Sequence, residues 1–234
     1  MKKAFTLSKR QILVGSVIGV CGLAIYKSLP NPIIDQIVWQ VIDRTPKKPP
    51  PPRVPFFSDI SEKAARLIDA AESQIGETLE YDAGYSKIAF PYGDISRRKG
   101  VCTDVIIRAF RDGLGIDLQA LVYEDMKKDF EAYPKKWGLE APDTNIDHRR
   151  VPNLLKFFER KGALVPISSN GRTYLPGDLV TAISPLKRPH IMLVSNRPNK
   201  NKSRPLVIHN IGAGTRIQDF LFEYELTGHI RFMT

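Results

Sequence analysis

The sequence predicts an α+β fold in which N-terminal helices pack on a small antiparallel sheet. Apolar residues recur at helical spacing between residues 61 and 162, and short apolar runs separated by turn residues follow between 179 and 233. Helices that precede consecutive strands are typical of α+β domains. The chain has 234 residues with a hydrophobic content of 42%, so we expect one domain with appendages.

The first 29 residues have the pattern of a signal peptide or an N-terminal membrane anchor. Four basic residues precede an uncharged apolar run over residues 12–25. This run is shorter than the ~20 residues of a spanning helix, and cleavage after Ala24 or retention as an anchor both stay open. Ser8-Lys9-Arg10 also resembles a twin-arginine export motif with lysine in the first position. We therefore expect an exported protein, either periplasmic or anchored to the membrane and facing the envelope.

Residues 30–56 are expected to link this segment to the domain. Apolar residues at helical spacing over 33–42 predict an amphipathic helix, which lies on a membrane surface or packs on the domain. Six prolines over residues 46–55 then predict a polyproline II spacer. The compact domain is expected over residues 57–234.

The net charge of +10 is concentrated near the N-terminus. Residues 1–60 carry nine Lys or Arg against three Asp or Glu, whereas residues 61–234 carry 26 against 22. A near-neutral domain without interleaved basic and aromatic residues argues against a nucleic-acid partner. The oligomeric state has no signal in the sequence.

Four helices are expected to precede four strands in the domain. The helices are predicted over residues 61–76, from 102, over 118–133, and from a cap at Asn145 or Asp147 to 162. A polar and aromatic loop over 81–99 separates the first two helices. The strands are predicted over 179–183, 190–194, 205–209 and 229–233.

Cys102 is the candidate nucleophile of this domain. It follows a glycine turn and opens the second predicted helix, where unpaired backbone N–H groups and the helix dipole are expected to lower a thiol pKa. The other cysteine, Cys21, lies in the N-terminal segment, so an exported domain would keep a free thiol in an oxidising compartment. The alternative interpretation is a buried structural cysteine.

His190 and His209 are the candidate partners of this thiol. His190 opens one predicted strand and His209 ends the next, and cross-strand neighbours lie ~5 Å apart. Cysteine catalysis needs a base within reach and a polar group that orients the base. A slip of one residue would send either ring to the other face, so spacing alone leaves the pairing open. His229 is expected to be structural.

No cofactor and no metal are expected. A metal site on the cysteine and two histidines is a third functional class, but neither a CxxC nor an HxxxH pair supports it.

Four elements in this order resemble the NlpC/P60 cysteine peptidases. They are Cys102 at a helix start, the run Pro176-Gly177-Asp178-Leu179-Val180, the strand that opens with His190, and the strand that ends in Ile208-His209. The resemblance implies a papain-like fold with Cys102 as nucleophile, His190 as base and His209 as third polar residue, with Asn210 as a weaker candidate to orient the base. The usual Asp-Cys-Ser-Gly is Val101-Cys102-Thr103-Asp104 here.

Three longer runs, residues 100–104, 143–154 and 207–212, resemble the YijF-like bacterial family of unknown function. This family is itself a distant relative of NlpC/P60. The resemblance covers almost the whole domain and implies its fold without a substrate.

Several residues around the nucleophile are candidates for substrate binding. Tyr81 and Tyr85 would form a wall of the site or pack within their loop. The polar stretch 145–150 would bind a carboxylate or form a helix cap and a solvated turn. The full set of candidates is Tyr81, Tyr85, Asp147, His148, Arg149 and Asn210.

Together these patterns predict a cell-envelope cysteine amidase or peptidase that works through a thioester acyl-enzyme. Peptidoglycan stem peptides are the expected substrate class, on the basis of the export pattern and the resemblance. The alternative is a non-catalytic envelope-binding module on the same fold.

Overall fold

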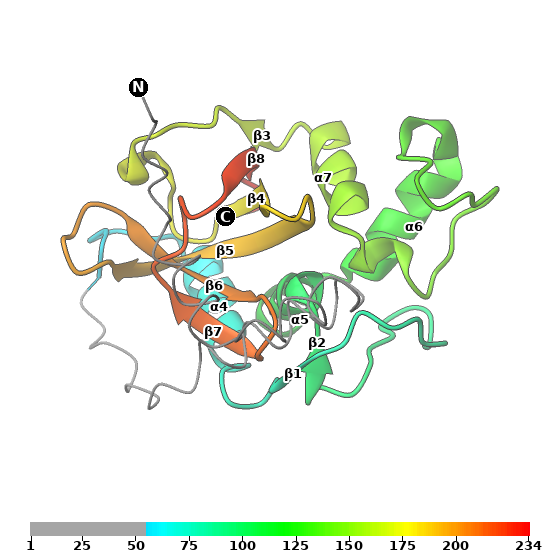
Figure 1. The fold of residues 1–234 in the computed structure, drawn as a ribbon, viewed down its shortest axis with the longest axis horizontal. Helices are drawn as coiled ribbons and strands as arrows, with labels where there is room; N and C mark the ends of the chain where they lie inside the picture. The colour runs from blue at the N-terminus through cyan, green and yellow to red at the C-terminus, as the bar shows by residue number, and fades with distance from the viewer. Residues whose placement is uncertain (1–54) are drawn as a thin grey trace, which may run out of the picture. The chain divides into compact units, whose positions relative to one another are not determined.

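The computed structural model describes residues 55–234, which form a mixed α+β domain. Over this range four helices accompany an antiparallel sheet, as the sequence predicts, but the sheet has six strands where four were expected. Figure 1 shows α5, α6 and α7 in green beside the yellow-to-red strands of the sheet. The predictions for residues 1–29 and for most of 30–56 lie outside the described residues. Within the described part, no helix is long and apolar enough to cross a membrane.

The first three helices begin close to their predicted starts, and the first and third end earlier than predicted. Ser61 caps the first helix, because its Oγ accepts a hydrogen bond from the Ala64 N–H at 3.0 Å. The helix expected over 118–133 stops early, and a short 3₁₀ turn, η1 (Phe130–Ala132), follows it. The bounds are α4 (Glu62–Glu72), α5 (Cys102–Leu114), α6 (Leu118–Lys128) and α7 (Val151–Arg160).

The start of α7 corrects the sequence-based prediction. Arg150 occupies its N-cap position and Pro152 lies in its first turn, so neither Asn145 nor Asp147 caps this helix. Asp147 instead opens a separate 3₁₀ turn, η2 (Asp147–Arg149), directly before it. Proline favours the first turn of a helix because its missing N–H would be unpaired there.

The sheet has the strand order β3-β8-β4-β5-β6-β7, and every neighbouring pair is antiparallel. Two strands of the sheet, β3 and β7, were not predicted, and β8 spans Glu225–Ile230 where a strand over residues 229–233 was expected. The bounds are β3 (Leu164–Val165), β4 (Leu179–Ile183), β5 (Pro189–Pro198), β6 (Pro205–Asn210), β7 (Thr215–Gln218) and β8 (Glu225–Ile230). A small parallel pair, β1 (Glu80–Tyr81) with β2 (Lys99–Gly100), precedes α5.

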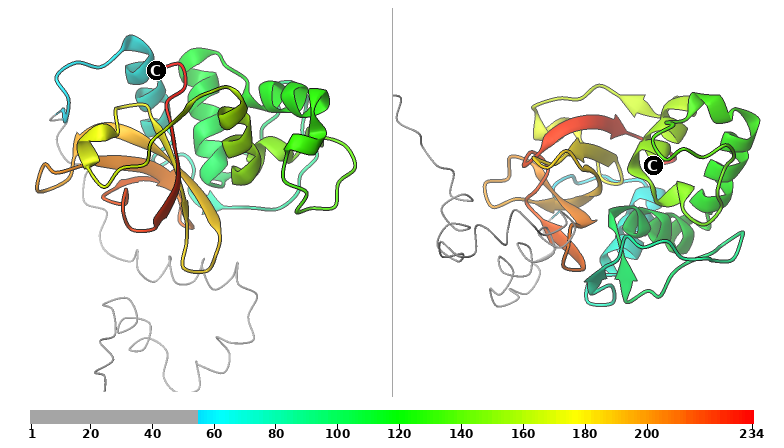
Figure 2. Two further views of the ribbon diagram at one scale, coloured as in Figure 1. Left: turned by 90° about the horizontal axis from the view of Figure 1, so that it is seen from above. Right: turned by 45° about the vertical axis from the view of Figure 1, so that its right-hand side comes forward.

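Helix α5 is the central element of the hydrophobic core. Val105, Ile106 and Phe110 on this helix are fully buried in a cluster that includes Ile191 and Ile208 of the sheet. Burial of each such side chain contributes about 1.5–3 kcal/mol. Figure 2 shows the helices gathered on one side of the strands. The first residue of α5 is therefore held in place by the packing of the whole helix.

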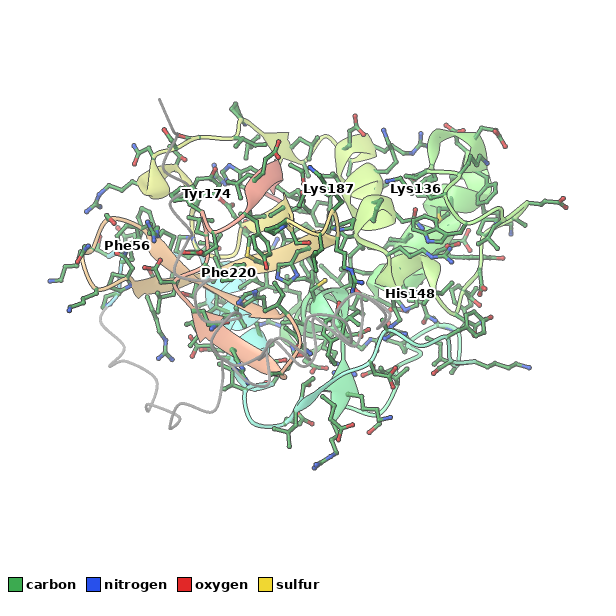
Figure 3. The ribbon with its side chains drawn as sticks, viewed as in Figure 1. Phe56, Lys136, His148, Tyr174, Lys187 and Phe220 are labelled. Carbon is green, nitrogen blue, oxygen red and sulfur yellow. The ribbon has the colours of Figure 1, made fainter. Side chains whose placement is uncertain are left out.

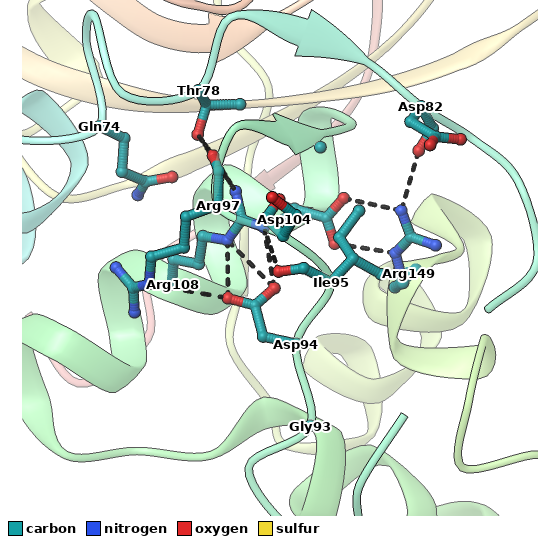
Figure 4. Close-up of polar contacts among 12 residues, drawn as sticks. Gln74, Thr78, Asp82, Gly93, Asp94, Ile95, Arg97, Asp104, Arg108 and Arg149 are labelled. Carbon is teal, nitrogen blue, oxygen red and sulfur yellow. Dashed lines mark hydrogen bonds and ion pairs between the residues drawn. The ribbon is translucent and has the colours of Figure 1, made fainter. Parts of the chain in front are cut away.

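A buried arginine fastens the long loop before α5 to that helix. Arg108 binds the Asp94 carboxylate at 2.8 Å and the Thr78 hydroxyl at 3.1 Å, and its side chain is almost wholly buried (Figure 4). A buried guanidinium needs such partners because an unpaired buried charge is strongly destabilising. Arg108 thus holds the segment before Cys102 against α5.

Candidate functional site

Cys102 is the first residue of α5 and lines a cleft of about 630 Å³. Tyr81, Tyr85 and Arg149 line the same cleft. A volume of this size is typical of pockets that hold small molecules or short peptide segments. The structure therefore brings the candidate nucleophile together with three of the predicted substrate-binding residues.

Cys102 is 3% exposed, and burial determines the protonation of its thiol. Burial raises the pKa of Cys102 to about 12, although the backbone N–H groups of Ile191 and Thr103 face the sulfur and lower it. The nearby Asp104 carboxylate raises the pKa further. The expectation that the helix start lowers this pKa is therefore wrong, because desolvation outweighs the backbone N–H groups. At neutral pH the thiol is protonated.

Asp104 and Arg149 hold the start of α5 in place. One Asp104 oxygen accepts a hydrogen bond from the Val101 N–H at 2.6 Å, and both oxygens bind the Arg149 guanidinium at 2.9 Å (Figure 4). The same guanidinium donates to the backbone carbonyls of Asp82 and Gly84, each at 3.0 Å. The carboxylate that Arg149 binds is therefore that of Asp104 in the same chain. Arg149 thus connects the first turn of α5, which carries Cys102, to the loop that carries Tyr85.

A chain of three side chains runs across β5, β6 and β7. His190 Nε2 lies 2.8 Å from His209 Nδ1, and His209 Nε2 lies 2.9 Å from Gln218 Oε1. Because Gln218 Oε1 can only accept, we assign the hydrogen of His209 to Nε2, and in this assignment His209 Nδ1 accepts the hydrogen of His190 Nε2. His190 Nδ1 then keeps a free lone pair. The two histidines lie next to each other, as predicted, and Gln218 adds a third member to their hydrogen-bonded chain.

Both histidines are neutral at pH 7. Burial lowers the pKa of His209 to about 4, and burial together with the neighbouring His209 lowers the pKa of His190 well below 6.5. The ring of Phe220 lies 4.7 Å from that of His209 and adds to this apolar setting. A neutral thiol and a neutral imidazole are therefore the resting state, and a thiolate–imidazolium pair is not.

The sulfur reaches β5 at the backbone of Ile191, the residue after His190. Over residues 55–234, no hydrogen bond joins Cys102 Sγ to the His190 ring. Catalytic hydrogen bonds are often long without substrate and tighten in the complex. The two groups lie on neighbouring elements that pack directly together, since α5 buries its apolar face against β5.

Asn210 has a different place from its neighbour His209. Its Nδ2 donates to the Gly100 carbonyl at 2.9 Å, and its Oδ1 accepts from the Gly212 N–H at 3.1 Å. Successive strand residues point to opposite faces, so His209 turns toward His190 while Asn210 turns toward β2. Asn210 thus ties β6 to the backbone just before the nucleophile.

Asp147 and His148 do not line the cleft. Asp147 pairs with Arg150 at 2.6 Å, and burial raises the pKa of its carboxyl. His148 is buried, its Nδ1 has no hydrogen-bond partner among residues 55–234, and burial lowers its pKa to about 4. Tyr85 is 63% exposed, and its hydroxyl donates to Asp143 at 3.1 Å.

Sequence reasoning missed several residues of the site. Gln218 lies on the strand that the alternation pattern did not reveal, and Trp137 and Lys136 lie in a segment that only appeared as a break between helices. Lys187 belongs to the turn between β4 and β5 and also lines the cleft. No spacing rule marks such residues, since they meet only through the tertiary fold.

In the described part of the chain, no group of three or more His, Cys, Asp or Glu side chains is placed to hold a metal ion.

The comparison with known proteins agrees with the longer of the two resemblances. Residues 68–232 match the family model described as a domain of unknown function, DUF1287. The chain is also 47% identical over 166 residues to the "Uncharacterized protein YijF" of Escherichia coli (strain K12). The aligned region covers 71% of this chain and 80% of that protein. On both grounds the chain belongs to the DUF1287 family.

Proposed function

We propose that this protein is a cysteine amidase or peptidase of the cell envelope. The observation that carries the proposal is the ordered chain from Gln218 through His209 to His190, beside a helix-start cysteine in a cleft. It leaves one nitrogen of His190 free to accept a proton while the other is held. That is what a general base needs.

The neutral resting state sets the order of the proposed steps. As Cys102 Sγ attacks the substrate carbonyl carbon, the thiol proton passes to His190 Nδ1, and the imidazolium is stabilised through His209. The C–N bond then breaks, and the amine leaves with the proton from His190. Water, deprotonated by the same nitrogen, hydrolyses the thioester and restores the thiol.

The start of α5 supplies the proposed oxyanion site. The first backbone N–H groups of a helix have no partner within the helix, and those of Cys102 and Thr103 already face the sulfur. Asp104 holds this turn through the Val101 N–H. The donors are therefore fixed before the substrate arrives.

Peptidoglycan stem peptides are the proposed substrate class. The export pattern of residues 1–29 and the resemblance of Cys102, His190 and His209 to the NlpC/P60 pattern support this choice. A cleft lined by aromatic and basic side chains is compatible with a short peptide.

A digest of purified cell wall by the full-length protein tests the proposal. We expect release of soluble peptides by the native protein and none by Cys102→Ala. Cys102→Ser is the matched variant, since it keeps the shape and loses most of the nucleophilicity. Full activity of Cys102→Ala would overturn the mechanism.

A non-catalytic binding module is the second candidate, and the burial and high pKa of the Cys102 thiol favour it. In a Cys21→Ser background, Cys102 is the remaining cysteine of the chain, so its alkylation by iodoacetamide can be followed alone. If His190 acts as a base, His190→Gln slows the alkylation. An identical rate in both proteins supports the binding module.

A further inference from the structure

The basic side chains around the cleft define the charge of what the cleft can hold. Four of its lining residues are basic, Lys136, Arg149, Arg150 and Lys187, and none is acidic. The charges of the two arginines are neutralised by ion pairs, Arg149 with Asp104 at 2.9 Å and Arg150 with Asp147 at 2.6 Å. Two positive charges are left.

The two lysines have no carboxylate partner in residues 55–234. Lys187 lies in the β4–β5 turn and Lys136 in the segment after η1, so they come from separate parts of the fold (Figure 3). By contrast, the neighbouring Lys135 pairs with Glu131 at 2.9 Å. Lysines left unpaired at the rim of a concave site raise the local concentration of anions.

The floor between these lysines is apolar and aromatic. The buried Val101 and Val151 line it, and the Arg150 guanidinium lies 4.1 Å from the centre of the Trp137 ring. Low-dielectric walls strengthen the field of charges at the rim. A ligand that fits must therefore combine an apolar or amide body with at least one anionic group.

We infer that Lys136 and Lys187 form an anion-binding subsite, so that the substrate of Cys102 is an acidic peptide with a carboxylate near the bond that is attacked. That the bound peptide is a substrate rests on the proposed function, whereas the binding of an acidic peptide requires no reaction. Lys187 and Lys136 are specificity-determining residues in this assignment.

Fluorescence of Trp137 measures the binding directly. The chain has two tryptophans, so a full-length Trp39→Phe, Cys102→Ala protein reports from the cleft alone and cannot turn over a ligand. The probes are the acetylated and amidated peptides Ala-Glu-Ala-Glu and Ala-Gln-Ala-Gln. We expect the acidic peptide to bind about tenfold more tightly, and less so as salt rises from about 0.05 M to about 0.5 M.

Two matched pairs of variants locate the subsite. Lys187→Gly and Lys136→Gln should each weaken binding of the acidic peptide about two- to fivefold. Lys202 also lies in a hairpin turn with positive φ, 52° against 59° for Lys187, so Lys202→Gly is the control for backbone effects. Lys135→Gln is the control for the second position. Neither control should change the affinity.

Equal affinity for the two peptides, or no binding of the acidic peptide at millimolar concentration, would overturn the inference. So would equal losses in the cleft variants and their controls. Binding of the acidic peptide without any cell-wall digestion by the native protein would keep the subsite and reject the proposed function. Digestion of cell wall without a preference for acidic peptides would keep the proposed function and reject the subsite.

Discussion

The domain contains two buried histidine clusters that differ in what remains free. His229 has oxygen acceptors at both ring nitrogens, Asp178 at 2.8 Å and the Pro166 carbonyl at 3.1 Å, and its ring stacks on Tyr174 at 4.3 Å. His190 is held at one nitrogen by His209, and the other has no partner in the described part of the chain. We call the cluster of His229 and Asp178 closed, because both ring nitrogens have partners, and the cluster of His190, His209 and Gln218 open, because one ring nitrogen of His190 is free within residues 55–234.

The closed cluster is the one with the carboxylate. Asp178 also binds the Arg231 guanidinium at 2.7 and 2.9 Å and accepts from the Leu175 N–H at 2.7 Å. A histidine–aspartate pair suggests a catalytic dyad when it is seen in isolation, but here it fastens β8 to the turn before β4. A free ring nitrogen beside a cleft separates a candidate base from a structural clamp, and a carboxylate partner does not.

The largest expected effect separates the two clusters by activity. His190→Gln keeps a donor to His209 but removes the base, so we expect kcat/KM for cell-wall peptides to fall by about 10³-fold. The thermal midpoint should change little, because glutamine fills most of the same space. Peptide release followed by chromatography measures the rate, and calorimetry measures the midpoint.

His229→Gln is the matched variant in the closed cluster. It should leave the rate per folded molecule unchanged while lowering the midpoint. Loss of activity in His229→Gln at a temperature where the protein is folded would remove the distinction between the clusters.

The next effect concerns stability and belongs to the closed cluster. Asp178→Asn removes the charge that faces Arg231 and His229 and leaves buried donors without a full set of acceptors. We expect the free energy of unfolding to fall by about 3 kcal/mol. Urea denaturation measures this. A loss smaller than that of an exposed control such as Asp219→Asn would show that the cluster contributes little.

The third effect is a shift of pH dependence in the open cluster. Burial lowers the pKa of His190 and His209, so the native rate should persist below pH 6.5 and be lost only as the base becomes protonated at lower pH. Gln218→Glu places a carboxylate beside His209 and stabilises its protonated form. The acid limb of kcat/KM should therefore move up by about one pH unit.

Gln218→Met is the control for this variant. It removes the group that sets the tautomer of His209 without adding charge, so the rate should fall at every pH while the limb does not move upward. An unshifted limb in Gln218→Glu would mean that His209 is not coupled to the base.

The order of elements and the candidate nucleophile could be predicted from the sequence, because they depend on local patterns. Helical spacing marks α5, and a glycine turn before it marks Cys102 as its first residue. His190 and His209 stand near the ends of apolar runs that are visible as strands. These features follow from neighbours along the chain.

The chemistry of the site could not be predicted, because it depends on residues brought together from elsewhere. The helix start suggested a low thiol pKa, but the burial that raises it comes from tertiary packing. Gln218 lies on a four-residue strand whose alternation is too short to recognise. Arg149 suggested a carboxylate-binding group, and its carboxylate is Asp104, 45 residues earlier in the chain.

The smallest effect concerns His148, a buried histidine that belongs to neither cluster. Burial lowers its pKa to about 4, so the unfolded chain binds its proton more readily and stability falls as pH drops from about 6.5 toward 4. His148→Leu removes this proton uptake and the unpartnered Nδ1. We therefore expect the variant to gain about 1 kcal/mol relative to the native protein at about pH 5.5, compared with pH 7.5. Urea denaturation at the two pH values measures the difference, and parallel pH dependences of the two proteins would show that His148 is already accessible to protons in the folded state.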